Sequence, residues 1–346
     1  MEFEQIRQLA MAATHNTPLT FSLKDGETKT YDLETMNDAL RKEFNKIAGN
    51  YKLFRSHKNE VFELIEDTID AVLPRRVMDQ YQQFADVKTV GQGDQAIFNI
   101  RVTEAARMRA KAFVTRVGLA GRYETMILDG KQLSVSTSAI GHAIRIGFEE
   151  FLDGRYSFAD FTNIMMEGMD DYIYNEIATA LLKATTTLPA VNVSSNASFD
   201  EAKMDGLLTI ADSYGNGNAA IYCTREFAST MKPANATWAS DEMKNRLWRD
   251  GYFTDYKGHP VIILRQSMTD ATNAEKVIDP ANAFILPSVG QKPVKIAFEG
   301  ATCVRTADDN DDWSTDLQTY KKFGVAILTN PSICLYSNTS LKKKTA

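Results

Sequence analysis

The sequence lacks any long hydrophobic run. Its longest apolar stretches, such as FGVAIL, contain about six residues, whereas a helix needs roughly 20 to cross a bilayer. The first residues, MEFEQIRQ, also lack the basic segment and apolar stretch of a secretory signal. We therefore expect no membrane association, and synthesis as a soluble protein in the cytoplasm.

Cysteine is scarce, with three residues in a chain of 346. Cys223, Cys303 and Cys334 each stand alone inside a strand-like run, and an odd number does not suit a disulfide framework. Buried apolar thiols in a reducing compartment are the better interpretation.

An excess of positive charge is also missing. Lys and Arg together number 39 against 45 Asp and Glu, which gives a net charge of -6. Proteins that grip nucleic acid over a wide surface neutralise its phosphates with Lys and Arg, so the balance argues against that class. With 44% hydrophobic and 24% charged residues the chain is typical of globular proteins, and its length favours more than one domain.

Several catalytic signatures are absent. The sequence contains no Gly-x-Ser-x-Gly, no His-Glu-x-x-His and no Gly-x-x-x-x-Gly-Lys. The GNGN stretch at 215–218 precedes a strand-like run instead of following one, which favours a turn over a dinucleotide site. We predict neither enzyme activity nor a cofactor. The histidines are scattered singly, which favours structural roles: His15, His57, His142 and His259.

The acidic stretch DDNDDW imitates a calcium loop at Asp308, Asn310 and Asp312. However, Trp313 stands where the tight turn needs Gly, and Thr319 stands where the bidentate Glu should be. A solvated acidic loop is the favoured interpretation, and a weak calcium site is the alternative.

The first 75 residues contain two helical patterns. Residues 34–48 place Met36, Leu40, Phe44 and Ile47 at helical spacing. A second pattern runs from Val61 to Val72 and is expected to end before Pro74. Because residues 1–33 carry little apolar material, we interpret this region as an arm whose helices present apolar faces with no partner nearby.

The stretch RYETMILDGKQLSVSTS, residues 122–138, predicts a β-hairpin. Its Asp129-Gly130 pair suits a type I′ turn between two β-rich runs. On the second run Leu133, Val135 and Thr137 alternate with serines. Neither face is apolar enough for a core of its own, so the hairpin must be covered by another part of the chain or by a second copy.

The strongest helical signal covers residues 157–186. Apolar side chains from Phe158 through Ala184, including Tyr172, hold a helical period, and Ser157 is a candidate N-cap. A helix of this length is roughly 45 Å long and would span a whole subunit. A polar stretch at 192–198 then precedes an α/β run with a helix at 199–213, a strand in AAIYCT and a helix at 224–232.

This order of elements resembles the tailed-bacteriophage major capsid proteins with the Hong Kong 97-like fold. GYFTDYKGHPV, residues 251–261, is similar to a family passage in which a turn leads through Gly-x-Pro into a strand. KKFGVAILTNPSICLY is similar to the family's closing hairpin. The resemblance implies an α+β fold with an N-terminal arm, an extended β-loop, a long spine helix, a peripheral domain and an α/β axial domain.

The resemblance also implies boundaries for these units: 1–75 for the arm and its helices, 76–148 for the extended loop and first peripheral strands, 149–198 for the spine helix, 199–305 for the axial domain, and 306–346 for returning peripheral strands and a C-terminal tail.

As a function, the resemblance implies a major head protein that self-assembles into an icosahedral shell around the double-stranded DNA of a tailed phage. The implied partners are copies of itself in hexamers and pentamers, a portal, decoration proteins and packaged DNA. The implied location is the virion, after assembly in the host cytoplasm. A start at Met1 leads us to expect a separate scaffolding protein. The alternatives are an encapsulin-like nanocompartment and an α/β enzyme with an unrecognised site.

The extended loop would lie across a neighbouring subunit, and it is locally basic. Residues 101–122 contain six Lys or Arg against Glu104 alone. We expect these cations to dock on acids of the neighbour, either Glu167, Asp170 and Asp171 or the 308–312 stretch, and to set register while apolar contacts supply affinity. The candidate contact residues are Arg107, Arg109, Lys111, Arg116, Arg122, Met126, Ile127 and Leu133.

Overall fold

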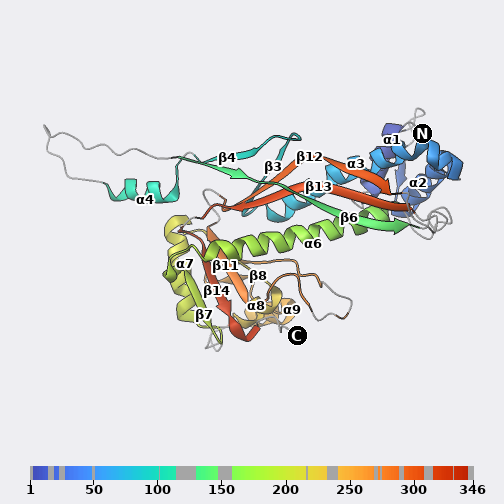
Figure 1. Ribbon diagram of the computed structural model, residues 1–346. Helices are drawn as coiled ribbons and strands as arrows, with labels where there is room; N and C mark the ends of the chain where they lie inside the picture. The colour runs from blue at the N-terminus through green and yellow to red at the C-terminus, as the bar shows by residue number, and fades with distance from the viewer. Residues whose placement is uncertain are drawn as a thin grey trace.

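The computed structural model describes residues 3–14, 19–22, 28–48, 51–100, 102–113, 130–146, 158–215, 217–231, 241–268, 272, 275–287, 292–307, 315–329 and 331–341. Two sheets lie on opposite sides of one long helix, α6 (Figure 1). A four-stranded sheet extends along the helix on one side, and a six-stranded sheet with its own helices lies on the other. A narrow ribbon of two strands projects from the end of the four-stranded sheet.

Helix α6 spans Phe158–Thr185, which confirms the predicted helix at 157–186. Its 28 residues correspond to about 42 Å at 1.5 Å per residue. Met165, Met169, Ile173 and Leu181 are buried at helical spacing. Tyr172 was placed on the same buried face and this is wrong, because its side chain is 49% exposed. The candidate cap, Ser157, lies outside the described residues.

The N-terminal helices are α1 (Phe3–Thr14), α2 (Leu33–Ala48) and α3 (Tyr51–Tyr81). A short antiparallel pair, β1 (Leu19–Ser22) and β2 (Thr28–Tyr31), joins the first two. The expectation that these helices lack a nearby partner is wrong. Ile6 and Leu9 of α1 and Met36 and Leu40 of α2 are buried in one core with α3 and α6 of the same chain. The apolar face of α1, which the sequence analysis missed, covers the apolar faces of α2 and α3.

Helix α3 does not end before Pro74 but continues for seven residues beyond it. Proline inside a helix removes one backbone hydrogen bond. Val77 and Tyr81, on the continuing part, are 1% and 2% exposed, so their burial offsets that loss.

The four-stranded sheet has the order β3-β12-β13-β6. Strand β12 runs parallel to β3 and antiparallel to β13, and β13 runs antiparallel to β6. Because β12 belongs to this sheet, the predicted axial boundary at 305 lies too late in the chain. The strands span Ala85–Val90 for β3, Val294–Ala307 for β12, Thr315–Ile327 for β13 and Ser138–Ile146 for β6.

The six-stranded sheet has the order β7-β14-β11-β8-β10-β9. The chain's last strand, β14, lies inside it between β7 and β11, so residues 306–346 do not all return to the first sheet as predicted. Cys223 and Cys334 are buried here and Cys303 is half-buried in β12, all as free thiols. The strands span Val193–Asn196 for β7, Ala219–Cys223 for β8, Asp255–Tyr256 for β9, His259–Ile263 for β10, Asn282–Pro287 for β11 and Cys334–Asn338 for β14.

Three helices accompany this second sheet: α7 (Glu201–Gly215), α8 (Arg225–Thr230) and α9 (Asp241–Asp250). The first two correspond to the helices predicted at 199–213 and 224–232. Single 3-10 turns at Ala190–Asn192 and Thr339–Leu341 flank the outer strands. The passage through Gly258 and Pro260 enters β10, as the resemblance implies.

Candidate assembly surface

The projecting ribbon consists of β4 (Ala96–Ile100) and β5 (Lys131–Val135), paired antiparallel from Ala96↔Val135 to Ile100↔Lys131. Helix α4 (Glu104–Ala112) follows β4, with Thr103 as its N-cap, and lies apart from both sheets (Figure 1). The described partner of β5 is therefore β4. The first arm of the predicted hairpin, 122–128, lies outside the described residues.

The candidate contact residues divide into two groups. Arg107, Arg109 and Lys111 lie on α4, with Arg109 and Lys111 exposed, and Leu133 is half-buried on β5. Arg116, Arg122, Met126 and Ile127 lie outside the described residues.

Glu299 of β12 contacts both ends of the ribbon where it joins the four-stranded sheet. Its Oε1 accepts hydrogen bonds from the Gly93 amide, at 3.0 Å, and from Lys322 Nζ, at 2.7 Å. Its Oε2 accepts one from the Thr137 hydroxyl. Gly93 lies in the turn before β4, and Thr137 lies in the two-residue link between β5 and β6, so Glu299 holds both strands where they leave the body. We call Gly93, Thr137, Glu299 and Lys322 the ribbon root.

The electrostatics of the root favour the ionised carboxylate. Hydrogen bonds from Lys322, Thr137 and the Gly93 amide lower the pKa of Glu299 to about 2. The same contact raises the pKa of Lys322. The root is therefore held by charge-assisted hydrogen bonds, which are stronger than neutral ones, over the neutral pH range.

Small side chains bring the ribbon onto the sheet. Ala96, Val135 and Ala297 form a buried apolar cluster, with Phe98 packed against it. The ammonium groups of Lys88 and Lys295 lie 6.0 and 5.5 Å from the centre of the Phe98 ring, within cation–π range. Near the body, then, the ribbon is covered by its own chain. The expectation that a second copy covers the hairpin can therefore apply only to the part of the ribbon beyond this cluster.

Just beyond the root, β12 contains a bulge, with its pairing to β13 shifting between Glu299 and Cys303. Asp70 of α3 accepts hydrogen bonds from the Thr302 amide at 3.0 Å and forms an ion pair with Lys321, whose side chain is 2% exposed. Lys321 Nζ also donates to the Gly300 carbonyl at 2.9 Å. These bonds fix the bulge to α3, so the strand that carries Glu299 is held on both sides.

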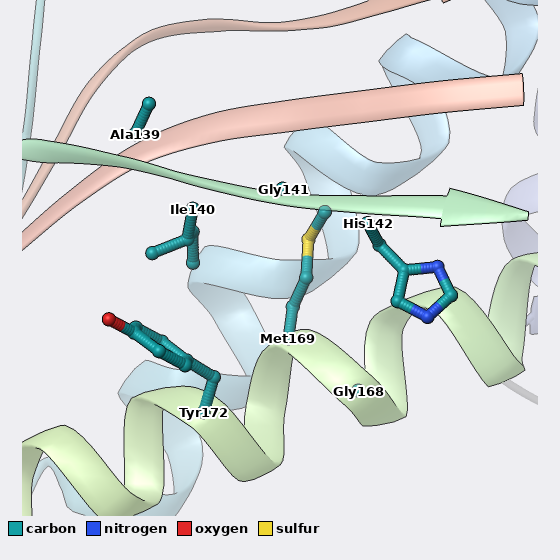
Figure 2. Close-up of a pocket in the computed structure, with 7 residues that line it drawn as sticks. All are labelled: Ala139, Ile140, Gly141, His142, Gly168, Met169 and Tyr172. Carbon is teal, nitrogen blue, oxygen red and sulfur yellow. The ribbon is translucent and has the colours of Figure 1, made fainter.

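A hollow of about 270 Å³ lies between the edge strand β6 and α6 (Figure 2). Ile140 and His142 of β6 point toward the helix, and Met169 and Tyr172 of α6 point toward the strand. Gly168 leaves room on the helix side, where a Cβ atom would lie 3.7 Å from His142 Cδ2. The hollow is thus a mostly apolar recess along an unpaired sheet edge, as far as the described residues extend.

The proposed acidic docking partners on α6 differ in their environments. Glu167 is exposed, and Asp171 accepts a hydrogen bond from the Ser267 hydroxyl at 2.7 Å. Asp170 is 2% exposed and lies 3.7 Å from Arg76 of its own α3, so it is wrong as a docking partner. Burial raises the pKa of Asp170 to about 6 despite Arg76 and Arg265. Residues 308–312 lie outside the described residues, as does the calcium alternative placed there.

Within the described parts of the chain, no group of three or more His, Cys, Asp or Glu side chains is arranged to hold a metal ion. No described helix is both long and apolar enough to cross a bilayer.

The sequence interpretation missed the root and the bulge. Gly300 offered a signal, because an isolated glycine inside a strand pattern indicates a bulge. Nothing local marked Glu299, whose partners Gly93 and Thr137 are more than 160 residues away in the chain.

Comparisons with known proteins identify a family for nearly the whole chain. Residues 6–337 match the family described as "SPbeta prophage-derived putative capsid protein YonB". No curated protein matches the sequence. Among solved structures, the chain is similar to the satellite phage P4 procapsid, with 10% identity over 78% of this chain and 90% of that one and a TM-score of 0.49.

Two further solved structures are similar at the same level. The mature capsid of bacteriophage PhiM1 shares 10% identity over 74% of this chain and 86% of that one, with a TM-score of 0.48. The holo-SrpI encapsulin complex from Synechococcus elongatus shares 12% identity over 76% and 89%, with a TM-score of 0.44. The α+β class and the element order implied by the capsid resemblance are confirmed in the structure. Because the family model matches nearly the whole sequence, the chain belongs to the YonB family of phage capsid proteins.

Proposed function

We propose that the chain is the major head protein of a tailed phage or prophage, and that copies assemble as hexamers and pentamers into an icosahedral shell enclosing double-stranded DNA. The expected partners are a separate scaffolding protein, a portal and decoration proteins. Assembly would take place in the host cytoplasm. Family membership supports the capsid role, and the projecting ribbon supports self-assembly through reciprocal contacts.

The ribbon is the main support for this proposal, because its inner part is packed on its own chain and its outer part stands away from the body. At the root it is held by Glu299 and by a small apolar cluster of its own chain. Farther out, α4 stands away from both sheets with exposed Arg109 and Lys111. Isolated two-stranded ribbons are marginally stable in water. A rigid base with an uncovered outer part is suited to reaching across a neighbouring subunit, which then covers it.

The β6–α6 hollow is the receiving surface that fits best. It offers the exposed ring of Tyr172 beside exposed Glu167, over the largely buried side chains of Ile140 and Met169. The basic α4 region would meet Glu167, and apolar ribbon residues would fill the recess. Exposed ion pairs contribute about 0 to 1 kcal/mol each, so they set register while apolar burial supplies most of the affinity.

Electron microscopy of the purified protein tests the proposal. We expect closed shells of uniform size, which contain DNA when purified from cells that carry the complete phage. Shells that contain a protein cargo and no DNA would support the encapsulin alternative instead. Discrete small oligomers at every concentration and in the presence of scaffolding protein would contradict a shell function.

A further inference from the structure

The six-stranded sheet carries an unusually exposed tryptophan. Trp248 lies on α9 and is 91% exposed, the highest value among the large apolar side chains in the described residues. Met243, five residues earlier, is half-buried against the domain. At 100° per residue the two side chains leave the helix about 140° apart. Trp248 therefore points away from Met243 and from the side of α9 that packs on its own domain, and its indole is almost fully exposed.

Near the inner face of the same helix lies an apolar hollow of about 350 Å³. Met243, Phe253 and Tyr256 supply its apolar lining, and Glu201, Asp255 and Lys257 supply its polar rim. The volume exceeds that of an indole side chain. Apolar recesses with a few placed polar groups are the usual form of binding sites.

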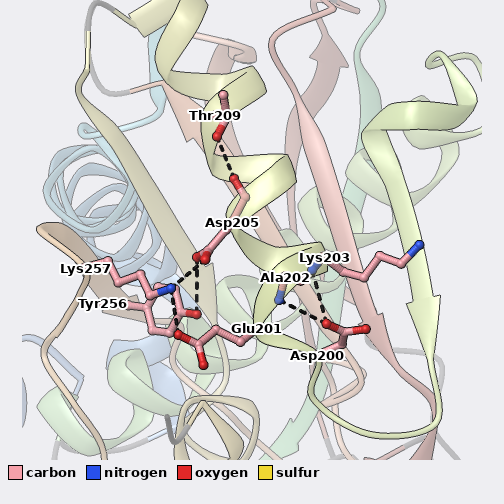
Figure 3. A network of polar contacts seen from close by, with 8 residues as sticks. All are labelled: Asp200, Glu201, Ala202, Lys203, Asp205, Thr209, Tyr256 and Lys257. Atoms are coloured by element: carbon pink, nitrogen blue, oxygen red, sulfur yellow. Dashed lines mark hydrogen bonds and ion pairs between the residues drawn. The ribbon is translucent and has the colours of Figure 1, made fainter. Parts of the chain in front are cut away.

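The rim of this hollow is held rigidly. Lys257 and Gly258 have φ values of 50° and 88°, as in a type I′ turn between β9 and β10. Lys257 Nζ lies 2.7 Å from Glu201 Oε1 and 2.5 Å from Asp205 Oδ2, both on α7 (Figure 3). These acids raise the pKa of Lys257, because they stabilise its charged form. A preorganised recess loses little conformational freedom on binding.

We propose that Trp248 of one copy occupies the hollow of the next copy around a ring. Within one copy the side chain and the hollow face apart, so neither can satisfy the other. Between copies the contact is heterologous, and such contacts generate closed rings when the rotation closes. The inference rests on the proposed shell function and names one interface within it.

The charges beside the two surfaces are complementary. Lys244, one helical turn before Trp248, and Arg249, next to it, are exposed cations beside the indole, and each also pairs with an acid of α9, Asp241 at 3.2 Å and Asp250 at 3.0 Å. Exposed pairs of this kind contribute little to stability, so either cation can turn to a carboxylate of a neighbour. On the rim of the hollow, the carboxylates of Glu201 and Asp255 outnumber the one cation, Lys257, which pairs with Glu201. Tryptophan and arginine are the residues most enriched among the contacts that dominate binding energy. A second copy of this chain therefore supplies an occupant that matches the hollow in both shape and charge.

Disulfide crosslinking tests the contact directly. The double variant Trp248→Cys/Phe253→Cys carries one thiol on each proposed surface. After oxidation of assembled shells, we expect a ladder of disulfide-linked species that ends at closed rings on a non-reducing gel. Each single variant is a control for the native thiols, and should give no ladder. Crosslinked dimers as the largest species would indicate a two-fold contact and overturn the proposal, as would shells that give no crosslinked product.

The variant Trp248→Ala supplies a second test that does not depend on crosslinking. The subunit concentration needed for half-maximal assembly should rise at least about tenfold, since hot-spot residues typically exceed that loss. Trp248→Phe, which keeps an aromatic ring, should recover part of it. Unfolding of the unassembled subunit should not change, because the side chain is exposed. If the wild type assembles and Trp248→Ala assembles at the same subunit concentration, the proposed contact is overturned but the shell function is not. If the wild type itself fails to assemble, the shell function is contradicted.

Discussion

Ser136 crosses β13 directly over Gly324. A Cβ atom added at Gly324 would lie 3.0 Å from the Ser136 carbonyl carbon, nearer still to its oxygen, and 3.1 Å from Val135 Cγ1. The absence of a side chain at one position in β13 therefore lets the chain pass from β5 to β6 in close contact with the sheet. This crossing, next to the Thr137–Glu299 hydrogen bond, sets where the ribbon leaves the body.

Gly324→Ala should destabilise the unassembled subunit by about 1 to 3 kcal/mol, because the added methyl group meets backbone that must shift. Denaturation in urea measures the change in the free energy of unfolding. Gly206→Ala is the matched control: nothing lies within 4 Å of its Cβ position inside α7, and alanine is favoured over glycine in a helix by up to about 1 kcal/mol. Equal effects of the two substitutions would contradict the close crossing.

Asp170 should make the subunit less stable as the pH rises. Burial raises its pKa from an ordinary 3.8 to about 6 in the folded state, so the folded chain holds this proton more tightly than the unfolded chain. The stabilisation is then fully present below about pH 4 and is lost as the pH rises through about 6. Arg76 and Arg265 oppose this shift, and Asp171 and Glu167 add to it.

Asp170→Asn removes that titration. From pH 4 to pH 7, the free energy of unfolding of the wild type should fall relative to the variant by about 2 to 3 kcal/mol. Urea denaturation at several pH values gives both curves, and other carboxyl groups cancel in the comparison. Parallel curves across the range would show that Asp170 is ionised as readily in the folded chain as in the unfolded one.

Glu299 should show the opposite dependence. Its pKa is lowered to about 2 by Lys322, Thr137 and the Gly93 amide, so its contribution is fully present above an ordinary pKa of 4.5 and is lost as the pH falls toward 2. Glu299→Gln keeps the shape and removes the charge. We expect faster amide hydrogen exchange at residues 91–95 and 136–138 in the variant at pH 7, with exchange in α7 unchanged. Unaltered exchange at the root would show that Glu299 does not hold the ribbon.

Two adjacent residues of α6 should separate stability from assembly. Ile173→Ala truncates a fully buried side chain and should cost about 2 to 5 kcal/mol of subunit stability. Tyr172→Ala removes a side chain that is 49% exposed beside the β6–α6 hollow, so stability should change by less than about 0.5 kcal/mol. Shell yield by sedimentation should nevertheless fall for Tyr172→Ala. Normal yield for this variant would exclude the hollow as the receiving surface.

The parts of this fold that were predictable are those defined by local periodicity. The helix expected at 157–186 is observed at Phe158–Thr185, because its apolar spacing and the flanking polar stretches are contained in one segment. Tyr172 was misplaced because an aromatic at the margin of a helical stripe can lie on either side of the burial boundary.

The ribbon root was not predictable in this way. Glu299, Gly93 and Thr137 are distant in the chain, and a charged residue or a glycine in a strand has no periodicity to reveal its partner. The apolar face of α1 was missed altogether. The apolar faces of the helical patterns at 34–48 and 61–72 were interpreted as lacking a nearby partner, because their cover in the same chain, which includes α1 and α6, comes from long-range contacts. Sequence patterns identified the exposed cations of α4 but not the contacts that hold the ribbon in place.

Replacement of the outer ribbon tests the central claim most directly. Ile100 and Lys131 are paired across β4 and β5, so an Asn-Gly turn can replace everything between them without disturbing the root. Sedimentation velocity should show that this variant remains an unassembled subunit, with wild-type urea stability, at concentrations where the wild type forms shells. If the variant forms shells as readily as the wild type, the ribbon does not drive assembly and the account is wrong.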